Sequence, residues 1–511
     1  MNPAEWLQRT AHRAPDAPAL LSGEIVVADY AEFARRAAAI GGALRSAHGI
    51  APGDRVALFM TNRTDYLELL YGVWFCGAVV VPINAKLHVR EVAWIVENAQ
   101  AKLAFVSQDI GAELPDVVPD TVEVIAVDGP SFEALRRAEP LAEPARFLAD
   151  DTLWLFYTSG TTGKPKGAEL THRGLVGQMS AAALTPPLLR GQEILMGLPV
   201  AHIMGFIAVL APMVSGVPVY FLDRFDAERA LEVIEDRRVT GFMGVPAMYR
   251  MMLEAGAADR DLTSVRFWLS GADVMPADLA RQFKSFGATV SVPLLGSFGE
   301  AAFVEGYGMV EVAGGVAAKV SPPMLPIGLG DSLGIRLPGW EFRVVDDEGE
   351  PVRGGASGEL QLRGPGVLEG YWGDEANTAA VLTEDGWLRT GDLVRPGPLG
   401  TVVFCGRVKN VVLSGGYTVY PTEVETDLEE HRDVAEAVVL GVPDARFGES
   451  VVAAVRLRPG AELTEEALMR WASQRMARYK APRRIVFVDE MPVTGTRKVQ
   501  RDKLAALFTT A

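Results

Sequence analysis

Residues 157–167, with the sequence YTSGTTGKPKG, carry the side chains that bind phosphate groups. Hydroxyls and exposed backbone amides donate hydrogen bonds to phosphate oxygens, and glycine lets the backbone approach a ligand closely. Lysine adds a mobile positive charge. The segment therefore predicts a loop that binds a polyphosphate, and its members include Thr158, Ser159, Gly160, Thr161, Thr162, Gly163, Lys164, Lys166 and Gly167.

The surroundings of this loop distinguish it from a flexible linker and from the common P-loop. The preceding residues 153–157 (LWLFY) are typical of a buried strand, which disfavours a flexible Ser/Thr/Gly linker. Lys164 is followed by Pro165, which lacks a backbone N–H and disfavours helix at the residue before it. The common P-loop runs from its lysine into a helix. We therefore expect the loop to cover a nucleotide rather than cradle it at a helix N-terminus.

The elements that position this loop alternate between strands and helices. Residues 30–46 predict a helix, 54–60 a strand, and 65–81 a buried helix followed by a strand that Pro82 ends. The same alternation continues at residues 102–107, 122–127 and 216–222. Apolar strands separated by amphipathic helices predict an α/β fold with a parallel sheet covered on both faces. Short strands from about residue 335 predict a β-rich subdomain, and a small α/β pattern follows Arg407.

Length and charge limit the class of protein. A chain of 511 residues with 49% hydrophobic content predicts two or more domains. The net charge of −16 argues against non-specific binding to nucleic acid or anionic membranes. Cys76 and Cys405 lie in apolar surroundings far apart, so we expect packed thiols in a reducing compartment. The N-terminus lacks the apolar region of a signal peptide, and the expected location is cytoplasmic.

The uncharged residues 205–222 require a test as a membrane span. Two prolines, Pro212 and Pro218, would break the backbone hydrogen bonds of a spanning helix. We interpret the run as a buried helix, a turn and a buried strand, so no membrane span is expected.

Four further motifs follow the phosphate loop. They are EGYGMVEV at 305–312, LRTGDL at 388–393, CGRVKN at 405–410 and TGTRKVQR at 494–501. Their order and spacing resemble the acyl- and aryl-CoA synthetases of the adenylate-forming (ANL) superfamily, over essentially the whole chain. The resemblance implies an acyl-CoA ligase that forms an acyl-adenylate from a carboxylic acid and ATP, releases pyrophosphate, and transfers the acyl group to coenzyme A.

The resemblance also implies an architecture. It predicts an N-terminal domain at 1–408, made of two α/β sheets and a β-rich subdomain at about 330–408. A small α+β lid at 409–511 is expected to rotate about a hinge at Lys409 between the two half-reactions.

Site residues carry over position by position. Tyr307 would stack on adenine, Asp392 supported by Arg407 would bind the ribose hydroxyls, and Glu311 would hold Mg²⁺. Lys498 would neutralise the carboxylate and the α-phosphate. By themselves, Asp392 also suits a turn and Lys498 a solvated position. The implied nucleotide site comprises Thr158, Ser159, Gly160, Thr161, Thr162, Gly163, Lys164, Tyr307, Gly308, Glu311, Asp392, Arg407 and Lys498, and the catalytic set Lys498, Thr158, His202 and Glu311.

The acyl and CoA sites follow in the same way. The implied acyl site comprises His202, Met248, Gly271, Ala272 and Gly306, and the CoA site Gly415 and Gly416. Methionines at 243, 248, 251 and 252 predict a soft apolar wall, with plain core packing as an equal alternative. Malonate-activating relatives carry arginine where this chain has Gly306, so a hydrophobic monocarboxylate is expected, either a fatty acid or a bulky aromatic or polycyclic acid.

The chain departs from the family pattern near the nucleotide. Val310 replaces a threonine before the Mg²⁺-binding glutamate, Arg497 replaces a glycine before Lys498, and residues 289–303 are an insertion. Asn410 replaces a frequent aspartate with little expected effect. Full two-step activity is favoured. The alternatives are thioesterification alone, with a separate enzyme supplying the acyl-adenylate, and loading of a carrier protein. A non-enzymatic binding protein is disfavoured because Lys498, Asp392 and Glu311 are retained.

Overall fold

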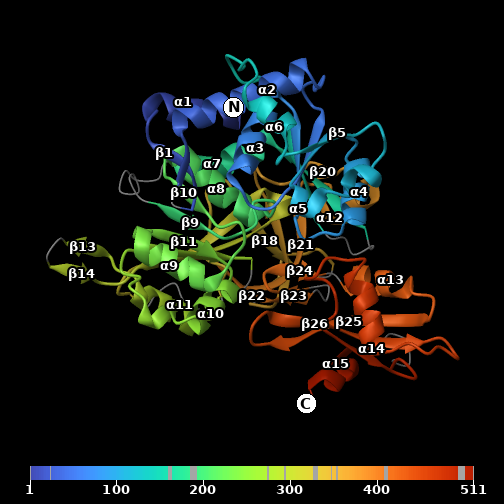
Figure 1. The fold of residues 1–511 in the computed structure, drawn as a ribbon. Helices are drawn as coiled ribbons and strands as arrows, with labels where there is room; N and C mark the ends of the chain where they lie inside the picture. Colours follow the sequence, from blue (N-terminus) through green and yellow to red (C-terminus); the bar gives the residue numbers. More distant parts are fainter. Residues whose placement is uncertain are drawn as a thin grey trace. The chain divides into compact units, whose positions relative to one another are not determined.

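The protein is described from a computed structural model that divides into two compact units. Unit 1 comprises Met1–Ala85, Ala93–Tyr157 and Gly167–Gly406, and unit 2 comprises Lys86–Val92, Thr158–Lys166 and Arg407–Ala511 (Figure 1). The structure describes residues 2–23, 25–158, 164–183, 193–272, 275–292, 295–325, 332–346, 348–352, 355–407, 412–419, 421–492 and 501–509.

A seven-stranded sheet contains the strands on either side of the phosphate loop. Its strands, in order across the sheet, are β20 (Gly370–Tyr371), β8 (Lys166–Thr171), β7 (Thr152–Thr158), β4 (Val79–Ile83), β3 (Arg55–Phe59), β5 (Ala101–Val106) and β6 (Glu123–Ala126). The strands from β7 to β6 pair in parallel, as expected. β20 pairs antiparallel with β8, which corrects the expectation of a purely parallel sheet. β4 also continues past Pro82, because that residue pairs with Leu58 inside the parallel ladder.

The helices predicted beside this sheet are present. α2 (Tyr30–Ser46) begins where the Asp29 side chain accepts a hydrogen bond from the Glu32 amide. Every residue of α3 (Thr64–Cys76) is buried, and Gly77 ends it with a φ of 91°. That left-handed conformation favours glycine, so the residue type and the helix end agree.

A nine-stranded mixed sheet forms the second layer of unit 1. Its order is β17 (Ile335–Arg336), β16 (Gly314–Ser321), β15 (Ala302–Met309), β12 (Phe267–Gly271), β11 (Gly241–Gly244), β9 (Ile194–Met196), β10 (Val219–Phe221), β1 (Pro18–Ser22) and β2 (Ile25–Asp29). The strands from β15 to β1 pair in parallel, whereas β2, β16 and β17 are antiparallel at the two edges. The parallel expectation thus holds for the centre only.

The uncharged run at 205–222 is a buried helix and strand, as predicted. α8 (Ile203–Ser215) precedes β10 in the nine-stranded sheet. Among the residues that the structure describes, no helix is both long enough and apolar enough to cross a membrane.

The β-rich region contains a four-stranded sheet of β18 (Glu341–Val345), β19 (Gly358–Arg363), β21 (Leu388–Pro396) and β22 (Val402–Arg407). Two other short strands of this region, β17 and β20, join the larger sheets instead. The β-rich region is therefore bound to both α/β layers by strand pairing.

Unit 2 contains a five-stranded sheet of β24 (Tyr417–Val419), β23 (Val412–Ser414), β26 (Gly448–Leu457), β25 (Val434–Asp444) and β27 (Arg484–Phe487). Val439 of β25 packs with residues of α13 (Pro421–Glu429) and α14 (Glu465–Ser473). Its neighbours Val438 and Leu440 pack with α15 (Arg501–Thr509). Because successive side chains point to opposite faces of a strand, helices cover both faces of this sheet.

The insertion at 289–303 forms a hairpin with a sheet of its own, β13 (Val290–Val292) and β14 (Gly296–Phe298) (Figure 1). Ser291 and Ser297 hydrogen-bond across it, and Arg266 donates to Ser291 Oγ at 2.8 Å. Val290 and Phe298 also pair across the strands but are 47% and 51% exposed. The serine face of the hairpin thus contacts Arg266, and its apolar residues Val290 and Phe298 are exposed.

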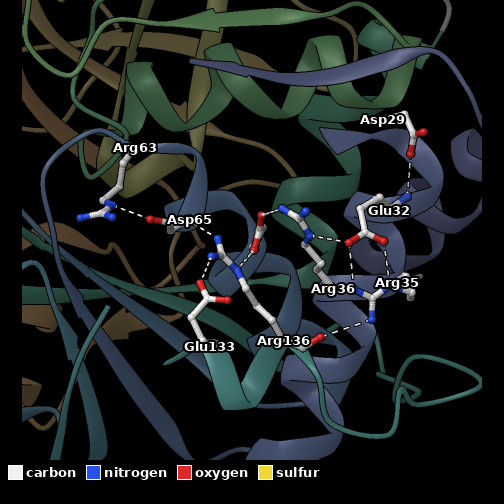
Figure 2. Close-up of polar contacts among 9 residues, drawn as sticks. Asp29, Glu32, Arg35, Arg36, Arg63, Asp65, Glu133 and Arg136 are labelled. Carbon is white, nitrogen blue, oxygen red and sulfur yellow. Dashed lines mark hydrogen bonds and ion pairs between the residues drawn. The ribbon is translucent and has the colours of Figure 1, made fainter. Parts of the chain in front are cut away.

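A buried network of ion pairs connects α2, α3 and α6 (Pro130–Arg136) (Figure 2). Glu68 is fully buried, and its two carboxylate oxygens lie 3.1 Å from Arg36 Nη1 and 2.6 Å from Arg136 Nε. Arg136 also pairs with Asp65, which lies 2.6 Å from Arg63 Nε. The network joins three helices through charges that neutralise one another.

Candidate nucleotide and acyl site

Two glycines of the predicted acyl site lie next to each other on parallel strands, at the point where β12 ends. Gly271 ends β12 and is paired in register with Gly306 of β15. A β-carbon on Gly271 would lie 3.1 Å from the Gly306 carbonyl oxygen and 3.2 Å from Met204 Sδ. Ala272 follows with a φ of 66°. Carboxyl ends of parallel strands are where α/β proteins bind ligands, so this edge is the candidate acyl site.

Methionine side chains lie close to these backbone positions. Met204, at the start of α8, approaches Gly271, and Met248 of α10 (Pro246–Glu254) has its sulfur 3.4 Å from the β-carbon position of Gly244. Met252 is instead fully buried in a core cluster with Tyr249, so that part of the expected methionine wall is core packing. Sequence reasoning missed Met204, although it lies only two residues beyond His202.

His202 lies immediately before α8 and is partly buried. Its backbone amide donates to the Pro199 carbonyl at 3.0 Å, and its carbonyl accepts from the Phe206 amide at 2.8 Å. The turn thus fixes the backbone at the start of the helix that carries Met204. This placement keeps His202 a candidate for the acyl site.

The structure brings Tyr307 and Asp392 together across 85 residues of sequence. The Tyr307 hydroxyl donates to Asp392 Oδ2 at 2.6 Å, and Asp392 is 1% exposed. Thr390 Oγ1 accepts from the Asp392 amide at 3.0 Å and donates to the Leu360 carbonyl at 2.6 Å. These bonds hold the aspartate beside the tyrosine.

Gly308 allows the backbone to turn after Tyr307. A β-carbon on Gly308 would lie 1.8 Å from the Gly314 carbonyl oxygen, which excludes any side chain without movement of the chain. The pairing of β15 with β16 shifts register at this point. Glycine is therefore required here by packing, in addition to any contact with a nucleotide.

Glu311 lies in a short 3₁₀ turn, Val310–Val312, directly after β15. Its Oε1 accepts a hydrogen bond from the Tyr371 hydroxyl at 3.0 Å, and its backbone carbonyl accepts from the Leu368 amide at 2.9 Å. Tyr371 was not predicted as a site residue, because its contact with Glu311 spans 60 residues and has no local sequence signature.

The residues present suit a metal that arrives with a nucleotide. Within the described part of the chain, no group of three or more His, Cys, Asp or Glu side chains is arranged to hold a metal ion. Mg²⁺ commonly binds proteins through one or two carboxylates together with substrate phosphates. The carboxylate of Glu311 is a donor of the type that fits a Mg²⁺ ion bound to ATP.

The phosphate loop follows the strand that the sequence predicts, and a second strand, which was not predicted, comes after it. β7 ends at Thr158 and β8 begins at Lys166, with Lys164 exposed between them. Ser159, Gly160, Thr161, Thr162 and Gly163 lie outside the described residues, as do Lys409, Asn410, Arg497 and Lys498. Arg407 is the last residue of β22.

The two glycines of the predicted CoA site form the turn between β23 and β24. Gly415 and Gly416 have φ values of 59° and 79°. Consecutive positive φ angles suit a two-residue hairpin turn and strongly favour glycine. A β-carbon on Gly415 would also lie 3.3 Å from Phe447 Cδ1. The turn itself accounts for both glycines, and their lack of side chains leaves the hairpin tip open.

The comparisons with known proteins cover the whole chain. Residues 7–372 match the family described as AMP-binding enzyme, and residues 423–498 match the AMP-binding enzyme C-terminal domain. Feruloyl-CoA synthase from Amycolatopsis sp is 34% identical over 522 residues, which cover 98% of both chains. The fatty acid–[acyl-carrier-protein] ligase ScoC from Streptomyces coeruleorubidus is 33% identical, over 98% of this chain and 95% of its own.

A solved structure agrees with these relatives. o-Succinylbenzoate CoA synthetase from Bacillus subtilis, a double mutant bound to a product analogue, superposes with a TM-score of 0.83. It is 27% identical and covers 98% of both chains. The chain therefore belongs to the adenylate-forming (ANL) superfamily, and within it to the AMP-forming acyl-CoA synthetases.

Proposed function

We propose that this acyl-CoA ligase acts on a hydrophobic monocarboxylic acid and carries out both half-reactions itself, with Mg²⁺·ATP and CoA. The observation that carries the proposal is the arrangement along β15. Gly306 faces Gly271 at the acyl edge, and the next residue, Tyr307, donates to Asp392 on the nucleotide side. This arrangement supports a site in which an acyl group and a nucleoside bind next to each other along one strand.

The chemistry assigns work to each side. In the first half-reaction, a carboxylate oxygen attacks the α-phosphorus of ATP and pyrophosphate leaves, which gives the acyl-adenylate. Tyr307 and Asp392 orient the nucleoside, and Glu311 would hold a Mg²⁺ ion, which when bound would neutralise charge on the phosphates. Lys498 reduces the repulsion between the two anions. In the second half-reaction, the CoA thiolate attacks the acyl carbonyl carbon, and AMP leaves.

The acyl edge favours an apolar, bulky acid. Gly271 and Gly306 contribute no side chains, and a β-carbon on Gly306 would meet no atom within 4 Å. Met204 and Met248 supply unbranched, polarizable side chains that adapt to aromatic or aliphatic groups. The relatives named for feruloyl-CoA and for a fatty acid fit this class. We therefore favour an aromatic or medium- to long-chain acid over a dicarboxylate.

The remaining parts of the proposal concern movement and location. We propose that residues 409–511 act as a lid that turns about Lys409 between the half-reactions, with Gly415 and Gly416 beside the CoA thiol. We also propose a cytoplasmic enzyme, because ATP and CoA are its substrates and Cys76 is a free, buried thiol.

Two assays with the same purified chain test the proposal. The first supplies ATP, Mg²⁺, CoA and a panel of aromatic and fatty acids, and measures AMP and acyl-CoA. The second supplies synthetic acyl-AMP and CoA without ATP. We expect product in both assays, and a Lys498→Ala variant should lose the first while retaining the second.

Two alternatives predict different results. Product in the second assay alone would show that adenylation has been lost, as Val310 and Arg497 suggest, and that a separate enzyme supplies the acyl-adenylate. Transfer to a carrier-protein phosphopantetheine in preference to CoA would favour the function named for ScoC. Activity with malonate alone would overturn the proposed acid class.

A further inference from the structure

We propose that Tyr371 is a positioning residue for the Mg²⁺ complex of ATP, and that its hydroxyl sets the orientation of the Glu311 carboxylate. This inference rests on the proposed role of Glu311. Tyr371 does not contact the reacting atoms in the proposed mechanism, and it acts only through Glu311.

The side chain and the main chain of Glu311 are both bound to the same short segment. The Tyr371 hydroxyl oxygen lies 3.0 Å from Glu311 Oε1, and Tyr371 is 8% exposed. Three residues earlier, the Leu368 amide donates to the Glu311 carbonyl at 2.9 Å. Two hydrogen bonds from residues 368–371 therefore restrict both the position of the turn and the rotation of its carboxylate.

The same segment is bound to the end of the phosphate-binding sequence. Tyr371 pairs antiparallel with Ala168 of β8, and the Trp372 amide donates to the Gly167 carbonyl at 2.8 Å. Gly167 is the last residue of the predicted phosphate segment. Residues 368–372 are thus hydrogen-bonded both to the start of β8, which follows the phosphate loop, and to Glu311, the residue proposed to bind the metal.

A third contact holds the link in place. Thr378 of α12 (Glu375–Val381) accepts from the Tyr371 amide at 2.8 Å and donates to the Asp374 carbonyl at 2.7 Å. A β-carbon on Gly370 would lie 3.0 Å from Thr378 Cγ2, so the strand and helix are in close contact. The tyrosine ring is therefore anchored at its backbone as well as at its hydroxyl.

The chemistry of the donor suits this role. A phenol is neutral, so it orients a carboxylate without adding a positive charge that would compete with a metal ion. Partners that orient metal-binding side chains typically change metal affinity by about 10- to 100-fold when they are removed. We expect a value near the lower limit, because Glu311 would share the metal with the phosphates of ATP.

The test compares ATP binding with and without the metal in Tyr371→Phe. Calorimetric titration with ATP in EDTA and with Mg²⁺·ATP gives the factor by which Mg²⁺ strengthens binding. We expect this factor to fall about tenfold in the variant. Binding of ATP in EDTA, the melting temperature, and thiolysis of synthetic acyl-AMP by CoA should stay as in the wild type.

Tyr71→Phe provides a matched control. Tyr71 is a fully buried tyrosine of α3 in the same unit, and the substitution removes the same hydroxyl group. We expect this control to keep the wild-type effect of Mg²⁺ on ATP binding.

Each other outcome overturns the proposal in a recognisable way. An unchanged Mg²⁺ effect in Tyr371→Phe would show that the hydroxyl does not position Glu311. An equal weakening of ATP binding with and without the metal would show a structural role. If Glu311→Gln also left the Mg²⁺ effect intact, Glu311 would not hold the metal. The proposed roles of Glu311 and of Tyr371 would then both be wrong.

Discussion

Carboxylates in unit 1 have two different kinds of hydrogen-bond donor. Glu68 accepts hydrogen bonds from the guanidinium groups of Arg36 and Arg136. Asp392 and Glu311 accept hydrogen bonds from the hydroxyls of Tyr307 and Tyr371. A guanidinium neutralises a carboxylate, whereas a phenol orients it and adds no charge. The contrast separates a carboxylate that holds helices together from the two for which we propose a ligand-binding role.

Burial decides how far the arginine partners compensate. Desolvation raises the pKa of Glu68 in spite of its two arginine neighbours. Glu32 in the same network is more exposed, and the hydrogen bond from Arg35 is the main cause that lowers its pKa to about 2. Two charges that leave water lose hydration energy, and their attraction must first offset this loss. The contacts of Glu68 with its arginines therefore add little net stability, but removing Glu68 alone leaves its partly buried guanidinium partners with fewer acceptors.

The largest expected effect comes from breaking the arginine-paired carboxylate. Glu68→Ala removes two charge-assisted hydrogen bonds, which should lower the free energy of unfolding by about 3 kcal/mol. Both arginines keep other carboxylate partners, so neither charge is left unpaired. Urea unfolding measures the loss. The control is Glu133→Ala, which removes the 49%-exposed partner of Arg136 and should cost about 1 kcal/mol or less. Equal losses in the two variants would refute the distinction by burial.

Asp392→Asn should have the opposite pattern, with a loss of activity rather than of stability. The amide can still accept the Tyr307 hydrogen bond, but charge-assisted bonds to ribose hydroxyls are lost, each worth about 1.5–3 kcal/mol. We expect kcat/KM for ATP to fall roughly 10- to 100-fold, with little change in melting temperature. Asp385→Asn, which alters an exposed partner of Arg343, is the matched control. A loss of stability without loss of activity would place Asp392 with Glu68 instead.

Val310→Thr should sharpen the comparison by adding a neutral donor beside Glu311. A hydroxyl that reaches a phosphate oxygen would contribute about 1.5 kcal/mol, so we expect adenylation to increase by up to roughly tenfold. Pyrophosphate exchange measures this step separately from thiolysis. Val310→Ala removes the isopropyl group without adding a hydroxyl and should give no increase. Equal rates in both variants would show that the hydroxyl does not reach the phosphates.

The last prediction concerns a third environment, in which a carboxylate lies near another carboxylate. Burial, and then repulsion from Glu423, raise the pKa of Asp427 to about 7. The native state thus binds this proton more tightly than the unfolded state, so the stabilisation is complete below about pH 4 and is lost as pH rises through 7. Asp427→Asn should reduce the fall in melting temperature between pH 5 and pH 8. An unchanged pH profile would contradict the raised pKa.

Features set by neighbouring residues in the sequence could be predicted, whereas features set by pairing between distant residues could not. Periodicity was sufficient for α2 and α3, and motif order was sufficient for the family and for the expectation that Tyr307 and Asp392 share a nucleotide. The antiparallel edges β2, β16 and β20 were not predicted, because strand direction at a sheet edge depends on pairing with distant residues. Tyr371 was missed for the same reason: its backbone pairs with β8 and its hydroxyl reaches Glu311.

Local patterns also did not predict the contact that the insertion makes. Residues 290–298 alternate weakly between serine and apolar types. This pattern does not indicate the hydrogen bond that Arg266 donates to Ser291. Likewise, only three-dimensional packing separates Met252, in the core with Tyr249, from Met204 beside Gly271.

The β13–β14 hairpin is a site at which additional residues should be tolerated. The Thr289 amide donates to the Phe298 carbonyl at 3.0 Å, so the two ends of the excursion meet at its base. The Ala302 amide donates to the Arg266 carbonyl at 2.9 Å and starts the pairing of β15 with β12 independently of the hairpin. Lengthening a closed surface loop costs little conformational entropy. A reporter peptide or an affinity tag grafted at the hairpin tip should therefore leave the register of β15 unaltered.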